Sequence, residues 1–186
     1  PMDQPADKYK SIQEWQQELV PALTKIKQDC QPYLSAIKNN LTQFPLFRGM
    51  NGTNSIVMTG RVRLDDRTSA GLGNDMHQAL HGSFTASFGE PFRNAMFVSS
   101  DPDFAKDYGN LYLVFPRGKF TYLWSPTVRD LYNLEALVEE AMEDDEDEQG
   151  QPHLTDLLDN SGYQDTSLPA GIASGNEIMI RCPTYY

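Results

Sequence analysis

The spacing of apolar residues changes near residue 43, and this change limits the folds open to the chain. Between residues 8 and 43, apolar side chains recur every three or four positions, which is the period of amphipathic helices. Pro21 and Pro32 stand where a second and a third helix would begin, because proline is tolerated in a first helical turn and disfavoured in a helix interior. The sequence predicts two or three packed helices in an N-terminal segment, 1–43.

From residue 44 to about 125 the period shortens toward that of strands. Residues 111–115 and 120–124 are rich in aromatic and aliphatic side chains and indicate two strands. Pro116-Arg117-Gly118-Lys119 separates them and has the chemistry of a hairpin turn. We therefore expect an α+β fold in which a mostly antiparallel sheet forms the second unit, 44–186.

Residues 126–173 are expected to be an insertion between strands. A helix is predicted over 127–142, followed by an acidic run, 143–148, in which like charges repel one another and favour a solvated loop. A short amphipathic turn is predicted over 154–158. The acidic run either keeps the chain soluble or docks on a basic partner.

Composition narrows the functional classes. The formal net charge is −11, which argues against tight binding to a phosphate backbone and favours a protein over a nucleic acid as partner. Cys30 and Cys182 lie in unrelated contexts without metal spacing, so buried or free thiols are expected. No apolar run has the length of a membrane span and no secretion signal is visible, so a cytoplasmic protein is predicted.

Three short motifs place polar groups at expected strand ends. The first, Pro45 to Met50, contains Arg48 and Gly49, and the second, Met96 to Asp101, contains Ser99 and Ser100. The third, Ser174 to Ile180, contains Glu177 at the start of an alternating run. Asp101 and the proline after it also suit the start of a helix.

In this order the motifs resemble the signature of the ADP-ribosyltransferase superfamily, in the branch whose catalytic letters are Arg, Ser and Glu. The resemblance implies a split sheet around an NAD cleft, with NAD as substrate and no metal. Arg48 would hold the phosphates bidentately, and Gly49 would let the backbone approach nicotinamide. Ser99, with Ser100 as its alternative, would bind the ribose or position the acid, and Glu177 would stabilise an oxocarbenium-like centre.

Other residues receive weaker roles from the same resemblance. Phe104 and Tyr108 could flank nicotinamide, although their spacing also suits a core. The loop before the glutamate selects the acceptor in the resembling enzymes, which points to three residues. They are Tyr163, Gln164 and Asp165.

The chain departs from the family pattern at two positions. Gly175 stands where enzymes that modify arginine or asparagine carry a Glu or Gln, and Asp101 replaces the third residue of a Ser-Thr-Ser triplet. A rival anchor is Leu80-His81-Gly82-Ser83, which resembles the His strand of the branch whose letters are His, Tyr and Glu. We rank it second, because His81 is expected to close a helix that Gly82 stops.

Three functions stay open at this point. The first is transfer of ADP-ribose from NAD to a macromolecular acceptor, with release of nicotinamide. The second is NAD hydrolysis in the same pocket, and the third is a catalytically silent binding protein that docks through the acidic run. The whole-chain pattern also resembles ADP-ribosyltransferase-like proteins of bacteriophages, which implies the cytoplasm of an infected bacterium as location.

Overall fold

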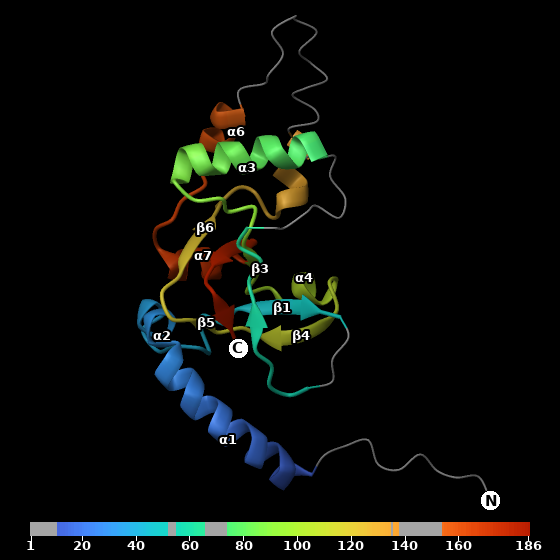
Figure 1. The fold of residues 1–186 in the computed structure, drawn as a ribbon, viewed down its shortest axis with the longest axis vertical. Helices are drawn as coiled ribbons and strands as arrows, with labels where there is room; N and C mark the ends of the chain where they lie inside the picture. The colour runs from blue at the N-terminus through green and yellow to red at the C-terminus, as the bar shows by residue number, and fades with distance from the viewer. Residues whose placement is uncertain (1–10, 52–54, 66–73, 135, 138–153) are drawn as a thin grey trace, which may run out of the picture.

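The chain folds as an α+β protein with small antiparallel sheets between two groups of helices (Figure 1). The computed structural model describes residues 11–51, 55–65, 74–134, 136–137 and 154–186. The helices are α1 (Ile12–Asp29), α2 (Gln31–Ala36), α3 (Asn74–Phe88), α4 (Pro102–Lys106), α6 (Leu154–Asn160) and α7 (Leu168–Ser174). The strands are β1 (Phe47–Met50), β2 (Gly60–Arg61), β3 (Met96–Val98), β4 (Asn110–Leu113), β5 (Pro116–Arg117), β6 (Thr121–Trp124), β7 (Ile178–Arg181) and β8 (Thr184–Tyr185).

The N-terminal helices form, but with a different boundary at Pro21. Helix α1 begins at a capping box between Ser11 and Glu14 and continues through Pro21, whereas Pro32 lies in the first turn of α2 as predicted. Proline has no backbone N–H, so the Gln17 carbonyl lacks its hydrogen bond within the helix. Gln17 is exposed, so water can donate a hydrogen bond to this carbonyl instead. The prediction of a helix start at Pro21 is therefore wrong.

Only the second half of α1 packs against the body of the protein. Ala22 and Ile26 are buried, whereas Ile12 and Val20 are 78% and 60% exposed. In Figure 1 the first turns of α1 extend away from the sheets. The predicted packing face is thus confirmed for the last turns of α1 and for the segment after it, where Leu34 and Ile37 are buried.

Every strand pair among the described residues is antiparallel, in agreement with the predicted mostly antiparallel sheet, but the expected hairpin does not form. β4 pairs with β1, and β6 pairs with β7 in a different sheet. Pro116 and Arg117, expected in the turn, instead pair as β5 with β8, and Gly118 at φ +70° provides the change of direction. The tight turn is lost because two of its four residues belong to a third sheet.

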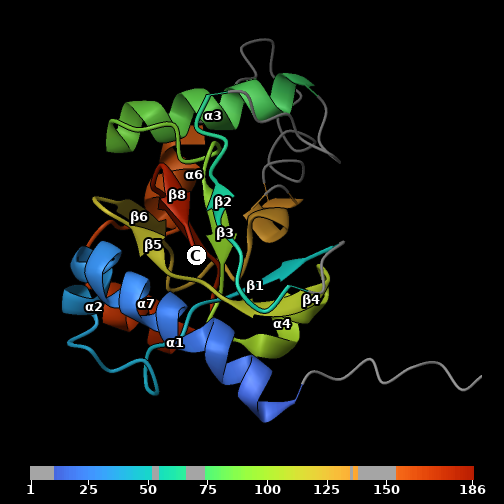
Figure 2. The same ribbon diagram turned by 60° about the horizontal axis from the view of Figure 1, so that its bottom comes forward.

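The sheet β3–β7–β6 separates two hydrophobic cores. Val98, Ile178 and Ile180 face the first core, which also contains Tyr33 of α2, whereas Met179 faces the second. Helix α3 closes the second core with Leu80 and Phe84. In Figure 2 it lies at the opposite end of the molecule from α1 and α2.

Helix α3 does not stop at Gly82. It runs through His81 to Phe88, and Gly89 with φ +72° follows it in the left-handed conformation typical of a helix stop. Burying Phe84 offsets the cost of about 1 kcal/mol for a glycine inside a helix. The predicted stop at Gly82 is wrong, and the rival anchor at His81 is helical rather than a strand.

The helix predicted over 127–142 begins later than expected. The Ser125 hydroxyl accepts backbone N–H groups of Thr127 and Val128 in a turn, and helical residues begin at Leu131 after the cap of Asp130. The acidic run 143–148 lies outside the described residues. The turn predicted at 154–158 is confirmed as part of α6.

Both cysteines are buried free thiols, as predicted. Burial raises the pKa of each thiol from 9.0 to about 11.

Between these values the unfolded chain has lost thiol protons that the folded chain keeps, so stability should fall as pH rises from 9 to 11. Thermal unfolding across this range measures the effect, and a Cys30→Ala variant should show a shallower decline. Rapid thiol modification of the native protein at pH 8 would contradict the burial.

Candidate functional site

The three motif strands lie next to one another in the centre of the fold. Ser99 and Phe47 exchange backbone hydrogen bonds of 2.7 and 3.0 Å, which joins the chain after β3 to β1. On its other side β3 pairs with β7, where Val98 is opposite Ile178. One further step in this register puts Ser99 opposite Glu177. The second and third motifs therefore meet at one end of the central sheet.

Ser99 fixes the backbone that leads into Glu177. Its hydroxyl is buried, donates to the Gly175 carbonyl at 2.7 Å and accepts the backbone N–H of Asp101 at 3.0 Å. The Ser100 hydroxyl donates to the Ile172 carbonyl in α7. Both serines thus hold the segment before the glutamate, and a role of Ser99 in positioning a catalytic acid stays a prediction.

Glu177 is half-buried at the mouth of β7 and is held at two points. Its backbone N–H donates to the Arg129 carbonyl at 2.7 Å, and its carboxylate accepts the Leu131 N–H at 3.1 Å. Burial and the nearby charge of Glu177 raise the pKa of Tyr108 to about 12 and also raise the pKa of Tyr163. An oriented carboxylate with two neighbouring phenols can stabilise positive charge in a bound ligand.

One residue next to Glu177, Arg129, was not recognised in the sequence. The Arg129 guanidinium lies 5.6 Å from the centre of the Phe104 ring and 3.3 Å from the Asp101 carboxylate. The other oxygen of Asp101 accepts the N–H groups of Asp103 and Phe104, so it caps α4. The predicted N-cap at Asp101 is confirmed. No local pattern marked Arg129, because its neighbours come from a segment 28 residues away.

Phe104 and the predicted acceptor loop are partly engaged in packing. Phe104 meets Tyr108 edge to face at 5.6 Å and lies under Arg129, so it is half-buried beside the site. Tyr163 packs against Phe84 at 5.3 Å, and Gln164 pairs through its backbone with Trp124. Within this loop, Asp165 is the predicted acceptor contact with an exposed side chain.

Arg48 lies on the other face of the sheet. Its guanidinium donates to the Tyr185 hydroxyl at 3.0 Å and lies 5.4 Å from the centre of that ring. Tyr185 belongs to the first core with Ile178, whereas Tyr163, beside Glu177, packs against the second. Phosphate binding by Arg48 stays a prediction, since the structure does not bring its guanidinium to the Glu177 carboxylate face.

Gly49 is in close contact with α4 rather than with open space. A Cβ at this position would lie 2.1 Å from the Ala105 carbonyl oxygen and 2.8 Å from the Tyr108 carbonyl carbon. The glycine is therefore required where β1 crosses the end of α4. The expected approach of nicotinamide to this backbone stays a prediction.

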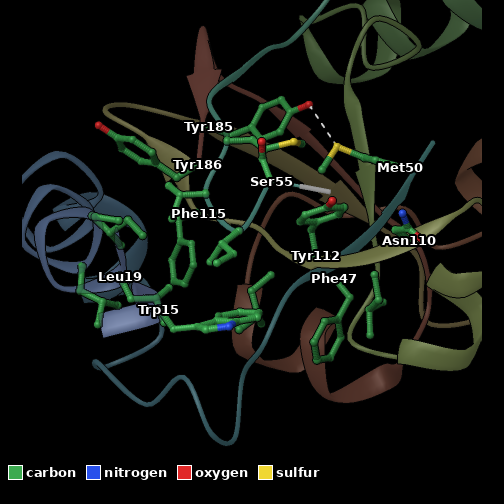
Figure 3. Close-up of a pocket in the computed structure, with 18 residues that line it drawn as sticks. Trp15, Leu19, Phe47, Met50, Ser55, Asn110, Tyr112, Phe115, Tyr185 and Tyr186 are labelled. Carbon is green, nitrogen blue, oxygen red and sulfur yellow. Dashed lines mark hydrogen bonds between the residues drawn. The ribbon is translucent and has the colours of Figure 1, made fainter. Parts of the chain in front are cut away.

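An apolar pocket of about 720 Å³ lies between α1 and the β1–β4 pair, and Tyr185, the partner of Arg48, is among its lining residues (Figure 3). Trp15 and Leu19 of α1 form one wall, and Phe47 and Tyr112 form part of another. Neither Arg48 nor Glu177 lines it. The pocket therefore does not coincide with the predicted catalytic residues.

The described part of the chain contains no cluster of three potential metal ligands among His, Cys, Asp and Glu. His77 is buried and its Nδ1 lies 3.3 Å from an Arg93 guanidinium nitrogen, and its ring centre is 6.4 Å from that of His81. Among the same described residues, no helix has the length and apolarity needed to cross a bilayer.

Comparison with protein-family models, curated proteins and solved structures gives no match for this chain.

Proposed function

We propose that the chain transfers ADP-ribose from NAD to a macromolecular acceptor and releases nicotinamide. The observation that supports this proposal best is the register of β3 and β7, in which Val98 lies opposite Ile178, so that Ser99 and Glu177 follow at the same end of the two strands. The buried hydroxyl of Ser99 also fixes the carbonyl two residues before Glu177. This arrangement supports the role that the motif resemblance gives to the serine, which is to position the acid.

Glu177 would act in the step that breaks the glycosidic bond. Its carboxylate accepts a hydrogen bond from a ribose hydroxyl and stabilises positive charge that grows on C1′ as the C1′–N bond breaks. The bonding electron pair leaves with nicotinamide and neutralises its ring nitrogen. A nucleophile of the acceptor then forms a bond to C1′ and gives up its proton to water. The Leu131 N–H keeps the carboxylate oriented during this step.

An NAD glycohydrolase is the second candidate, because the same residues serve a water nucleophile equally well. Glu177 is half-buried rather than enclosed, and Arg129 beside it is exposed, so water can reach this face. Incubation with NAD labelled in the adenine ring separates the functions. Label on a macromolecule supports transfer, free ADP-ribose supports hydrolysis, and no nicotinamide release contradicts both enzymes.

Gly175 leads to a prediction about the acceptor. It ends α7 at φ +75°, a conformation that favours glycine, and its position carries no side chain to orient a guanidinium. We therefore expect little modification of arginine side chains. Mass spectrometry of proteins labelled in a bacterial lysate measures the modified residue type, and a majority of ADP-ribosyl-arginine would overturn the prediction.

A further inference from the structure

The face that carries Glu177 presents an exposed cation that the motif resemblance does not assign. The Arg129 side chain is 61% exposed, although its main chain is fixed by the hydrogen bond from the Glu177 N–H to the Arg129 carbonyl. The Arg129 backbone is thus held next to that of Glu177, and its guanidinium lies at Asp101 and Phe104. Arg48, by contrast, donates to Tyr185 on the face of the first core.

We propose that Arg129 binds the pyrophosphate of NAD, an inference that rests on the proposed function. Within NAD, the nicotinamide ribose is bonded through its 5′-oxygen directly to one phosphate. A ribose placed at Glu177 therefore brings that phosphate to neighbouring groups. The chain carries a net charge of −11, so a dianionic ligand needs a local cation at this site.

The contacts of Arg129 suit a group that changes partners. Phe104 lies under the face of the guanidinium at 5.6 Å, which leaves the N–H groups at its edge for an anion. In the structure the guanidinium pairs with the Asp101 carboxylate at 3.3 Å. The Arg129 side chain is 61% exposed and the Asp101 side chain 33%. Exposed ion pairs contribute little to stability, so exchange of Asp101 for a pyrophosphate costs little.

Asp101 then acts as a competitor inside the site. Its second oxygen caps α4, and asparagine caps a helix as well as aspartate does. Asp101→Asn therefore removes the competing charge and keeps the cap. If the Arg129–Asp101 pair only supported the fold, both single variants would bind the ligand more weakly. Our proposal instead predicts weaker binding in Arg129→Ala and tighter binding in Asp101→Asn.

The experiment measures calorimetric binding of ADP-ribose and of nicotinamide riboside, which has no phosphate. We expect Arg129→Ala to weaken ADP-ribose binding about 10- to 100-fold, Arg129→Lys to recover part of it, and Asp101→Asn to tighten it. Nicotinamide riboside should bind all variants equally. Lys106→Ala removes the same charge from nearby α4 and should change affinity less than about threefold.

Several results would overturn the proposal. They are unchanged ADP-ribose affinity in Arg129→Ala, an equal loss in Lys106→Ala, a larger loss in Arg48→Ala, or weaker binding in Asp101→Asn. Thermal unfolding of each variant confirms that it is folded. Failure of the wild-type protein to bind either NAD or ADP-ribose would instead reject the proposed function itself.

Discussion

Glu177→Gln is expected to lower the rate of nicotinamide release from NAD by about 10²-fold or more. The carboxylate charge is needed mainly in the transition state, when positive charge develops on the ribose, so NAD affinity should change little. The variant keeps an oxygen that can accept the Leu131 N–H, which preserves the hydrogen bond seen in the folded protein. Nicotinamide release under saturating NAD, together with calorimetric NAD binding, measures both quantities.

A matched control and an independent readout accompany this test. Asp165→Asn removes one negative charge from the exposed loop before the site and should leave hydrolysis of NAD unchanged. In Glu177→Gln the pKa of Tyr108 should fall below about 12, because the Glu177 charge contributes to raising it. Turnover equal to that of the wild type in Glu177→Gln would rule out the mechanism.

Local signals in the sequence predicted the elements that carry the candidate site better than they predicted the connections between elements. The cap at Asp101, the strand before Ser99 and the strand after Glu177 depend on neighbours within a few residues, and all three form. The alternation of Ile178 and Ile180 toward the first core leaves Glu177 on the opposite face.

Three of the failures share a physical cause, which is that distant burial or pairing outweighed a local preference. Gly82 did not stop α3 because Phe84 is buried in the second core. Pro116 and Arg117 did not form a hairpin because β8 pairs with them from the C-terminal end of the chain. Arg129 was missed for the same reason, since its contacts to Asp101 and Phe104 exist only in the folded chain.

Gly49→Ala is expected to destabilise the protein by about 3 kcal/mol, near the upper end of the range for overpacked sites. The added methyl group would lie 2.1 Å from the Ala105 carbonyl oxygen and 2.9 Å from the Gly109 nitrogen. These are backbone atoms at the end of α4, so no side-chain rotation relieves the overlap, and β1 or α4 has to move. The free energy of unfolding in urea measures the loss.

Gly82→Ala is the matched control for the change at Gly49. A Cβ at Gly82 meets nothing within 4 Å, and α3 is already helical there, so the variant should gain about 0.5–1 kcal/mol. A loss of stability in Gly49→Ala and a gain in Gly82→Ala would show that the loss comes from the overlap between β1 and α4. It would not come from replacing a glycine in general. Equal stability of Gly49→Ala and wild type would mean that α4 does not press on β1, and the glycine after Arg48 would then be open to a ligand.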